Sequence, residues 1–265
     1  MCWPIRRKKG TTHCQNHAEE RQMIVFKLNN QQYTHPETCE DVTIQQVIEF
    51  YRDVYPTRPA LMLEMSEAVS EEPINEKRVA AIEKKMQSKV WISNQLYPYF
   101  VRVVHHFCRV PVDVLGDKKM NPAHLEYLYH HCIGAMRNPG DVQYKQLYLI
   151  DGEVYKLPTK LMSQSTLQEF AESAQYEENA EIASKGRPDT HEFYEGLLNV
   201  CSVILRKENE EYSEEVYERN RKRFKTLPLQ TMYEVGFFLK TLSLNYVLGL
   251  NLSLLRRAVQ ELQTT

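Results

Sequence analysis

Residues 148–158 read YLIDGEVYKLP, in which two short apolar runs flank Asp151-Gly152. Aspartate followed by glycine tolerates the positive φ angles of a tight two-residue turn, so this stretch predicts a β-hairpin. Pro158 then ends the return strand, because proline has no backbone N–H to donate. A helix is predicted to start soon afterwards at Thr166-Leu167-Gln168-Glu169, a capping-box pattern in which side chains bond free backbone N–H groups.

A related pattern occurs near the beginning of the chain. Residues 24–28 alternate as a strand, Asn29-Asn30 suits a tight turn, and residues 31–34 complete a second predicted hairpin. Thr43-Ile44-Gln45-Gln46 then repeats the capping box. The two stretches align from strand to helix start with one inserted residue, Ser165, which indicates a tandem duplication.

Helical patterns fill much of the remaining chain. Residues 55–74 are rich in proline and glutamate and predict a linker or a short helix, and residues 75–110 predict a longer helical region interrupted near Pro98. Asn121-Pro122 starts another helix, with proline at the first helical position. The sequence therefore predicts a mainly α protein with small β-hairpins, an α+β fold of two pseudo-repeated hairpin-plus-helices modules.

The domain organisation follows from this repeat. We expect a disordered basic extension at residues 1–22, a first hairpin-helical module at 23–138, and a second at 139–265 that ends in an apolar C-terminal helix. The boundary falls at the turn sequence Asn138-Pro139-Gly140-Asp141. If the two hairpins pack together across a pseudo-twofold axis, they form a small four-stranded sheet, which would cover strands that are marginal alone.

Composition narrows the class of protein. The formal net charge is −2, from 33 basic and 35 acidic residues. The chain therefore has no excess of positive charge, which a general nucleic-acid binder would need. Six scattered cysteines are typical of reduced thiols in a cytoplasmic protein, and nine glycines argue against a dinucleotide or P-loop fold. The longest apolar stretch, 239–255, is interrupted by polar residues and falls short of the roughly 20 apolar residues that a bilayer span needs.

Two histidine-cysteine clusters raise the question of zinc. They are His105-His106-Phe107-Cys108 and His130-His131-Cys132, and tetrahedral zinc needs four such ligands, usually as close pairs. Our interpretation is that Phe107, Cys108, Tyr129 and Cys132 pack inward while the histidines lie at the rim. A cysteine nucleophile needs a base that a third group orients, and no local motif supports Cys108, Cys132 or Cys201 in that role. The paired glutamates resemble solvated helix faces. We therefore predict no catalytic, metal-binding or cofactor-binding residues and no cofactor.

The basic run at 219–225 is the strongest charge feature. It follows an acidic stretch, 208–218, so a helix over 213–224 would be acidic at its start and basic at its end, as the helix dipole favours. The alternative is a nucleic-acid patch, with residues 1–22 as a basic arm.

Aromatic residues suggest protein binding. The chain has 16 tyrosines, a residue type enriched at protein interfaces. The apolar C-terminal segment either closes the core of the second half or presents a helix face to a partner. The residues that we predict to contact that partner are Tyr233, Phe237, Phe238, Leu242 and Tyr246.

The two hairpin-and-helix stretches carry a family resemblance. Residues 26–33 with Pro36 and Thr43–Gln46, and residues 148–170, resemble the opening of tail-assembly chaperones of tailed bacteriophages. The resemblance implies a non-catalytic protein of the host cytoplasm that holds a helical client such as the tape-measure protein, and oligomers are compatible with it. Two alternatives stay open: a structural virion component, such as a connector or internal protein, and a nucleic-acid-binding regulator.

Overall fold

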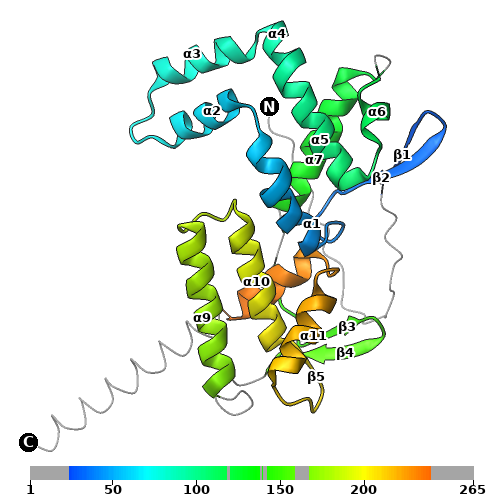
Figure 1. The fold of residues 1–265 in the computed structure, drawn as a ribbon, viewed down its shortest axis with the longest axis vertical. Coiled ribbons are helices and arrows are strands. Elements are labelled where there is room, and N and C mark those ends of the chain that lie inside the picture. The colour runs from blue at the N-terminus through cyan, green and yellow to red at the C-terminus, as the bar shows by residue number, and fades with distance from the viewer. Residues whose placement is uncertain (1–23, 118–119, 138, 140–141, 159–166, 240–265) are drawn as a thin grey trace, which may run out of the picture.

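The computed structural model describes residues 24–117, 120–137, 139, 142–158 and 167–239. The protein is mainly helical and contains two small antiparallel sheets, which confirms the predicted α+β class. The helices of the first half gather at one end of the long axis and those of the second half at the other (Figure 1). Within the described ranges, none of the helices combines the length and the apolar character that crossing a bilayer requires.

The first half consists of a hairpin followed by helices. Its elements are β1 (Ile24–Leu28), β2 (Gln31–His35), α1 (Ile44–Glu49), η1 (Phe50–Val54), η2 (Tyr55–Thr57), α2 (Ala60–Ser70), α3 (Glu76–Met86), α4 (Lys89–Trp91), η3 (Ile92–Leu96), α5 (Tyr97–Cys108), α6 (Val112–Leu115) and α7 (Pro122–Arg137). The second half also begins with a hairpin. Its elements are β3 (Leu147–Ile150), β4 (Glu153–Lys156), α9 (Leu167–Ser184), α10 (His191–Ile204), β5 (Arg206–Lys207), α11 (Glu214–Phe224) and a helix over 229–239.

Both predicted hairpins are present, and their turn residues have the expected backbone. Asn29 and Asn30 have φ angles of 48° and 63°, and Asp151 and Gly152 have 48° and 77°. Two successive positive φ angles match the right-handed twist of the flanking strands, so the strands pair directly across each turn. The tandem duplication itself stays a prediction.

The expected four-stranded sheet is wrong. β1 and β2 form a sheet of their own, whereas β5 pairs with β4 to complete a separate sheet in the order β3-β4-β5. Different partners cover the two hairpins: β2 lies against α5 and α7, and Tyr155 of β4 contacts Phe224 of α11 edge-on at 5.4 Å. Each hairpin therefore buries its inner face on helices of its own half.

The helix starts follow the predicted capping chemistry. Thr43 caps α1 in a complete capping box with Gln46, and the Asn121 side chain accepts a hydrogen bond from the Ala123 N–H at the start of α7. The predicted capping box at Thr166 lies outside the described residues, as do Ser165 and the extension 1–22.

The helical chain does not end near Pro98, although its α-helical hydrogen-bond pattern changes to a π-helical turn directly before that residue. The helical chain is interrupted earlier, at Gln87 and Ser88, where Ser88 adopts an extended backbone with ψ 124°. From Lys89 the helix continues through the π-helical turn η3 into α5, and Pro98 lies in the first turn of α5. Pro98 has no N–H to donate to a carbonyl of the preceding turn, and the π-helical turn directly before it is where the regular α-helical hydrogen-bond pattern is interrupted. Residues 55–74 contain the helix α2.

Backbone hydrogen bonds join the two halves. The N–H of Ile44 donates to the Leu227 carbonyl at 3.0 Å, and the N–H of Leu229 donates to the Val42 carbonyl at 2.7 Å. Nearby, the rings of Tyr51 and Tyr194 stack with centroids 5.2 Å apart. Buried apolar residues from both halves form one continuous cluster, so the predicted modules share a core although each keeps its own hairpin.

Replacing Thr43 with alanine is expected to lower the free energy of unfolding by about 1 kcal/mol. The substitution removes the hydroxyl that accepts the Gln46 N–H, and caps of this kind contribute about 0.5–2 kcal/mol. Urea denaturation followed by circular dichroism measures the change. Thr57→Ala, at the end of a short exposed turn, is the control and should change stability by less than half as much.

Candidate protein-binding groove

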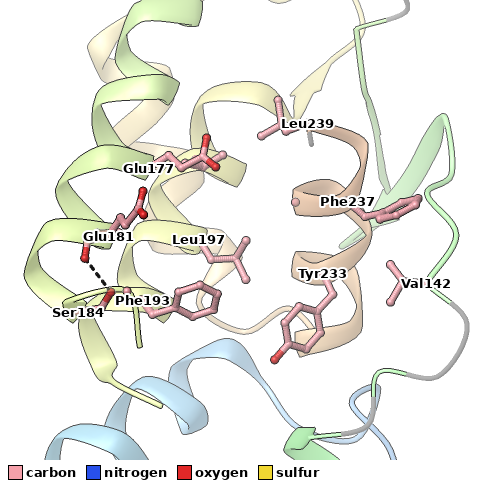
Figure 2. A pocket seen from close by; sticks show the side chains of 13 residues that line it. Val142, Glu177, Glu181, Ser184, Phe193, Leu197, Tyr233, Phe237 and Leu239 are labelled. Carbon is pink, nitrogen blue, oxygen red and sulfur yellow. Dashed lines mark hydrogen bonds between the residues drawn. The ribbon is translucent and has the colours of Figure 1, made fainter. Parts of the chain in front are cut away.

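A groove lies over α10, between α9 and the 229–239 helix. Its volume is about 560 Å³. Leu197 and Phe193 of α10 form its floor, and the 229–239 helix contributes Tyr233, Phe237 and Leu239. In Figure 2 the Phe237 ring lies on the side of this helix that faces Val142. The spacings of the lining residues on each helix are those of a single helix face. The groove is therefore mostly apolar and is built by three helices of the second half.

Two glycines let these helices approach closely. A Cβ atom built on Gly196 of α10 would lie 2.2 Å from the Cβ of Ala180 on α9. A Cβ on Gly236 would lie 3.0 Å from Cδ1 of Leu197. Because glycine has no side chain, α9 and the 229–239 helix both rest near the backbone of α10 at these points. This close packing fixes the width of the groove.

One wall of the groove is acidic. Glu177 and Glu181 lie on the α9 side, and both are exposed. The sequence of α9 contains no lysine or arginine, and no described cation lies within 4 Å of either carboxylate. Ser184, the last residue of α9, also lines the groove, and its hydroxyl donates to the Glu181 carbonyl at 3.2 Å (Figure 2). The groove thus places a negative edge beside an apolar floor.

The structure places the predicted contact residues in three different settings. Phe237 is 46% exposed at the groove, and Tyr233 lines it with its ring half-buried. Phe238 is 3% exposed and packs on Tyr144 with ring centroids 5.1 Å apart, so it belongs to the core and offers no outward surface. Leu242 and Tyr246 lie outside the described residues.

A hydroxyl pair lies at the lower end of the groove. The hydroxyl groups of Tyr233 and Tyr194 are 3.3 Å apart, and burial raises the pKa of Tyr233 to about 12. Burial also raises the pKa of Tyr194. Both phenols are therefore neutral near pH 7, so they serve as hydrogen-bonding groups at this end of the groove.

The cysteines of the described ranges are buried thiols. Cys108 and Cys132 meet between α5 and α7 with their sulfur atoms 3.7 Å apart, a proximity that the sequence did not predict. Burial raises the pKa of Cys39 to about 11, and the contact with Cys108 together with burial raises that of Cys132. Protonated thiols are poor nucleophiles. Within the described ranges, no three His, Cys, Asp or Glu side chains gather closely enough to hold a metal ion.

The prediction that the histidines lie at the rim is wrong for His106. Its side chain is buried, and its Nε2 lies 2.7 Å from the Gln46 carbonyl of α1. This hydrogen bond satisfies the ring nitrogen inside the protein, which is what allows a polar ring to occupy a core position.

Acidification is expected to destabilise the protein through His106. Burial lowers the pKa of His106, and the hydrogen bond to Gln46 only partly opposes this effect. Below the ordinary histidine pKa of about 6.5, the unfolded chain therefore binds more protons than the folded one. The free energy of unfolding decreases as the pH is lowered below that value. Urea denaturation at pH 7 and pH 5.5 measures this loss, and His106→Gln should make it smaller. An unchanged pH dependence in that variant would contradict the assignment.

The basic run at 219–225 is mostly paired within the protein. It ends α11, whose first turn holds Glu214 and Glu215, as predicted from the helix dipole. Arg219 pairs with Glu210 at 2.7 Å, and Arg221 donates to the Asn199 side chain at 2.8 Å. Arg223 bonds Asp151 and Glu153 of the hairpin. These contacts tie α11 to the β3-β4 turn and leave the arginines less available to phosphates.

Sequence reasoning missed the α9 and α10 sides of the groove. The prediction placed the contact surface in the C-terminal segment alone, whereas Glu177, Leu197 and their neighbours supply most of the lining. One signal was present: Gly196 interrupts an apolar helical pattern, and an isolated glycine there often marks close packing.

Comparison of the chain with protein-family models, with curated proteins and with solved structures finds no match.

Proposed function

We propose that this protein is a non-enzymatic binding protein whose groove holds an amphipathic helix of another protein. The observation that carries the proposal is the apolar floor of Leu197 and Phe193 beside the acidic edge of Glu177 and Glu181. An apolar groove of this kind suits a helix that presents residues at i, i+3, i+4 and i+7. The acidic edge selects a helix with lysine or arginine beside that apolar face.

The resemblance of the hairpin-and-capped-helix stretches gives this activity a context. In a tail-assembly chaperone of a tailed bacteriophage, the bound helix would belong to a long, aggregation-prone client such as the tape-measure protein. We propose that the protein acts in this way in the host cytoplasm. The buried thiols and neutral phenols described above support a binding role, because none of them is poised as a nucleophile or base.

Two labelled peptides test the groove directly. Both form a helix with a leucine ridge, and the ridge is flanked by lysines in one and by glutamates in the other. Fluorescence anisotropy should show tighter binding of the lysine peptide, by tenfold or more at low salt. The double charge reversal Glu177→Lys/Glu181→Lys changes only exposed side chains and should reverse the preference. Equal binding of both peptides to both proteins would contradict the proposal.

A second pair of variants separates the groove from other apolar surface. Leu197→Asp changes the groove floor and should weaken binding of the lysine peptide at least tenfold. Leu149→Asp is the matched control, because Leu149 is 75% exposed on the outer face of β3 and lies away from the groove lining. Binding by the control variant should stay within twofold of the unmodified protein.

The phage assignment needs a separate experiment. The product of a long helical reading frame beside the gene is co-expressed with the protein, and its soluble fraction is measured. A chaperone should keep that client soluble, and Leu197→Asp should not. A chaperone should also be absent from purified virions, whereas a structural virion component would be present in them.

A further inference from the structure

A second cavity lies in the first half of the protein, far in sequence from the groove. Its volume is about 250 Å³, and it is enclosed by η1, η2, α2, α5 and α7. Its walls combine aromatic rings with flexible thioethers, contributed by Tyr55, Tyr99, Tyr129, Met62, Met65 and Met136. Aromatic faces and methionine side chains adapt well to a flat apolar ligand.

An arginine in this wall has an unused donor. The guanidinium carbon of Arg58 lies 3.8 Å from the centroid of the Tyr55 ring, so the ring covers one face of the guanidinium. Its Nη1 atom is buried and has no hydrogen-bond partner among the residues that the structure describes. Guanidinium N–H groups point outward in the plane of the group, along its edge. A buried donor without a partner costs about 1–3 kcal/mol, and more when it is charged.

The neighbouring hydroxyls do not supply a negative charge. Tyr55 donates its hydroxyl to Asp189 at 2.7 Å, and burial raises the pKa of Tyr55 to about 12. Burial likewise raises the pKa of Tyr99. Both phenols therefore stay neutral near pH 7, and the positive charge of Arg58 faces the cavity without a phenolate to balance it.

We propose that this cavity binds a small molecule that carries a single carboxylate on a flat apolar body, with the carboxylate on Arg58. One guanidinium with a free donor matches one negative charge, and a carboxylate pairs with guanidinium N–H groups in good geometry. A phosphate dianion would need further buried donors for its additional charge and oxygens. Arg137 also lines the cavity but is exposed, so it marks the side that is open to solvent. This site is separate from the groove in both place and ligand.

The probe is 3-phenylpropionate, titrated into the full chain labelled with ¹³C at the methionine methyl groups. The signals of Met62, Met65 and Met136 should shift, and those of Met86 and Met232 should not, because neither lines the cavity. The neutral amide 3-phenylpropanamide should bind at least tenfold more weakly, and phenyl phosphate should bind more weakly than the carboxylate. Equal binding of acid and amide, or shifts elsewhere only, would overturn the proposal.

Arginine variants supply an independent test. Arg58→Gln should weaken 3-phenylpropionate binding at least tenfold. Arg58→Lys keeps the positive charge, so its affinity for 3-phenylpropionate should decrease less. Arg52→Gln is the control, because Arg52 pairs with Asp53 at an exposed position outside the cavity lining. The affinity of this variant for 3-phenylpropionate should stay within twofold of that of the unmodified protein. If Arg58→Gln does not fold, the comparison of acid with amide on the unmodified protein still decides the matter. No binding of the carboxylate at any accessible concentration would mean that water satisfies Arg58.

Discussion

Replacing Gly196 with alanine is expected to lower the free energy of unfolding by about 3 kcal/mol, because overpacking of a well-packed core typically costs about 1–3 kcal/mol and occasionally more. The new methyl group would lie 2.2 Å from the Cβ of Ala180 and 3.5 Å from the Tyr176 carbonyl oxygen. Neither atom can rotate away, so α9 must move off α10. Urea denaturation gives the loss of stability, and the lysine peptide should bind the folded variant more weakly because the groove changes width.

Gly134→Ala is the matched control for this substitution. Gly134 also lies inside a helix, α7, but a Cβ added there meets nothing within 4 Å. Alanine costs less conformational entropy than glycine in a helix, so this variant should gain about 0.4–1 kcal/mol. Similar small changes in the stability of the two alanine variants would contradict the close contact between α9 and α10 at Gly196.

Replacing Arg206 with leucine is expected to lower the free energy of unfolding by about 3–5 kcal/mol, the usual cost of removing one partner from a buried ion pair. Arg206 binds both carboxylate oxygens of Glu169, at 2.6 and 3.1 Å, and the Glu169 side chain is 1% exposed. The variant removes the guanidinium group that both oxygens of this buried carboxylate bind. Chemical denaturation at pH 7 measures the effect.

Two further variants make this result specific. Arg52→Leu breaks the pair with Asp53, whose side chains are 46% and 56% exposed, and should cost less than about 1 kcal/mol. The double variant Glu169→Leu/Arg206→Leu should recover much of the loss, because an apolar pair can replace a buried ion pair at little cost. A single Arg206→Leu variant no less stable than Arg52→Leu would contradict the buried pairing.

The sequence predicted the parts of the fold that local chemistry determines. Asn29-Asn30 and Asp151-Gly152 form the expected turns, Thr43 caps α1, and Pro122 begins α7. In each case a few adjacent residues determine the local conformation, because turns and helix caps depend on side chains within about three positions.

Features that depend on distant residues escaped prediction. His106 is buried because the Gln46 carbonyl of another helix can accept its hydrogen bond, and Cys132 meets Cys108 only when α5 packs on α7. The groove likewise needs α9, α10 and the 229–239 helix in place before its lining residues converge. Tyr233 and Phe237 were predicted to contact a partner from composition alone, whereas the acidic edge of α9 could be recognised only from its position beside them.

The backbone pairing between residues 42–44 and 227–229 has a consequence for how the protein is made. The first turn of α1 donates to the Leu227 carbonyl, so this part of the first half cannot be completed until almost the whole second half has left the ribosome. At synthesis rates of about 5–20 residues per second, that delay is roughly ten to forty seconds. During this time Ile44 and Val47, both buried in the finished protein, stay uncovered on the nascent chain. We therefore expect the nascent chain to bind molecular chaperones of the cell during its synthesis.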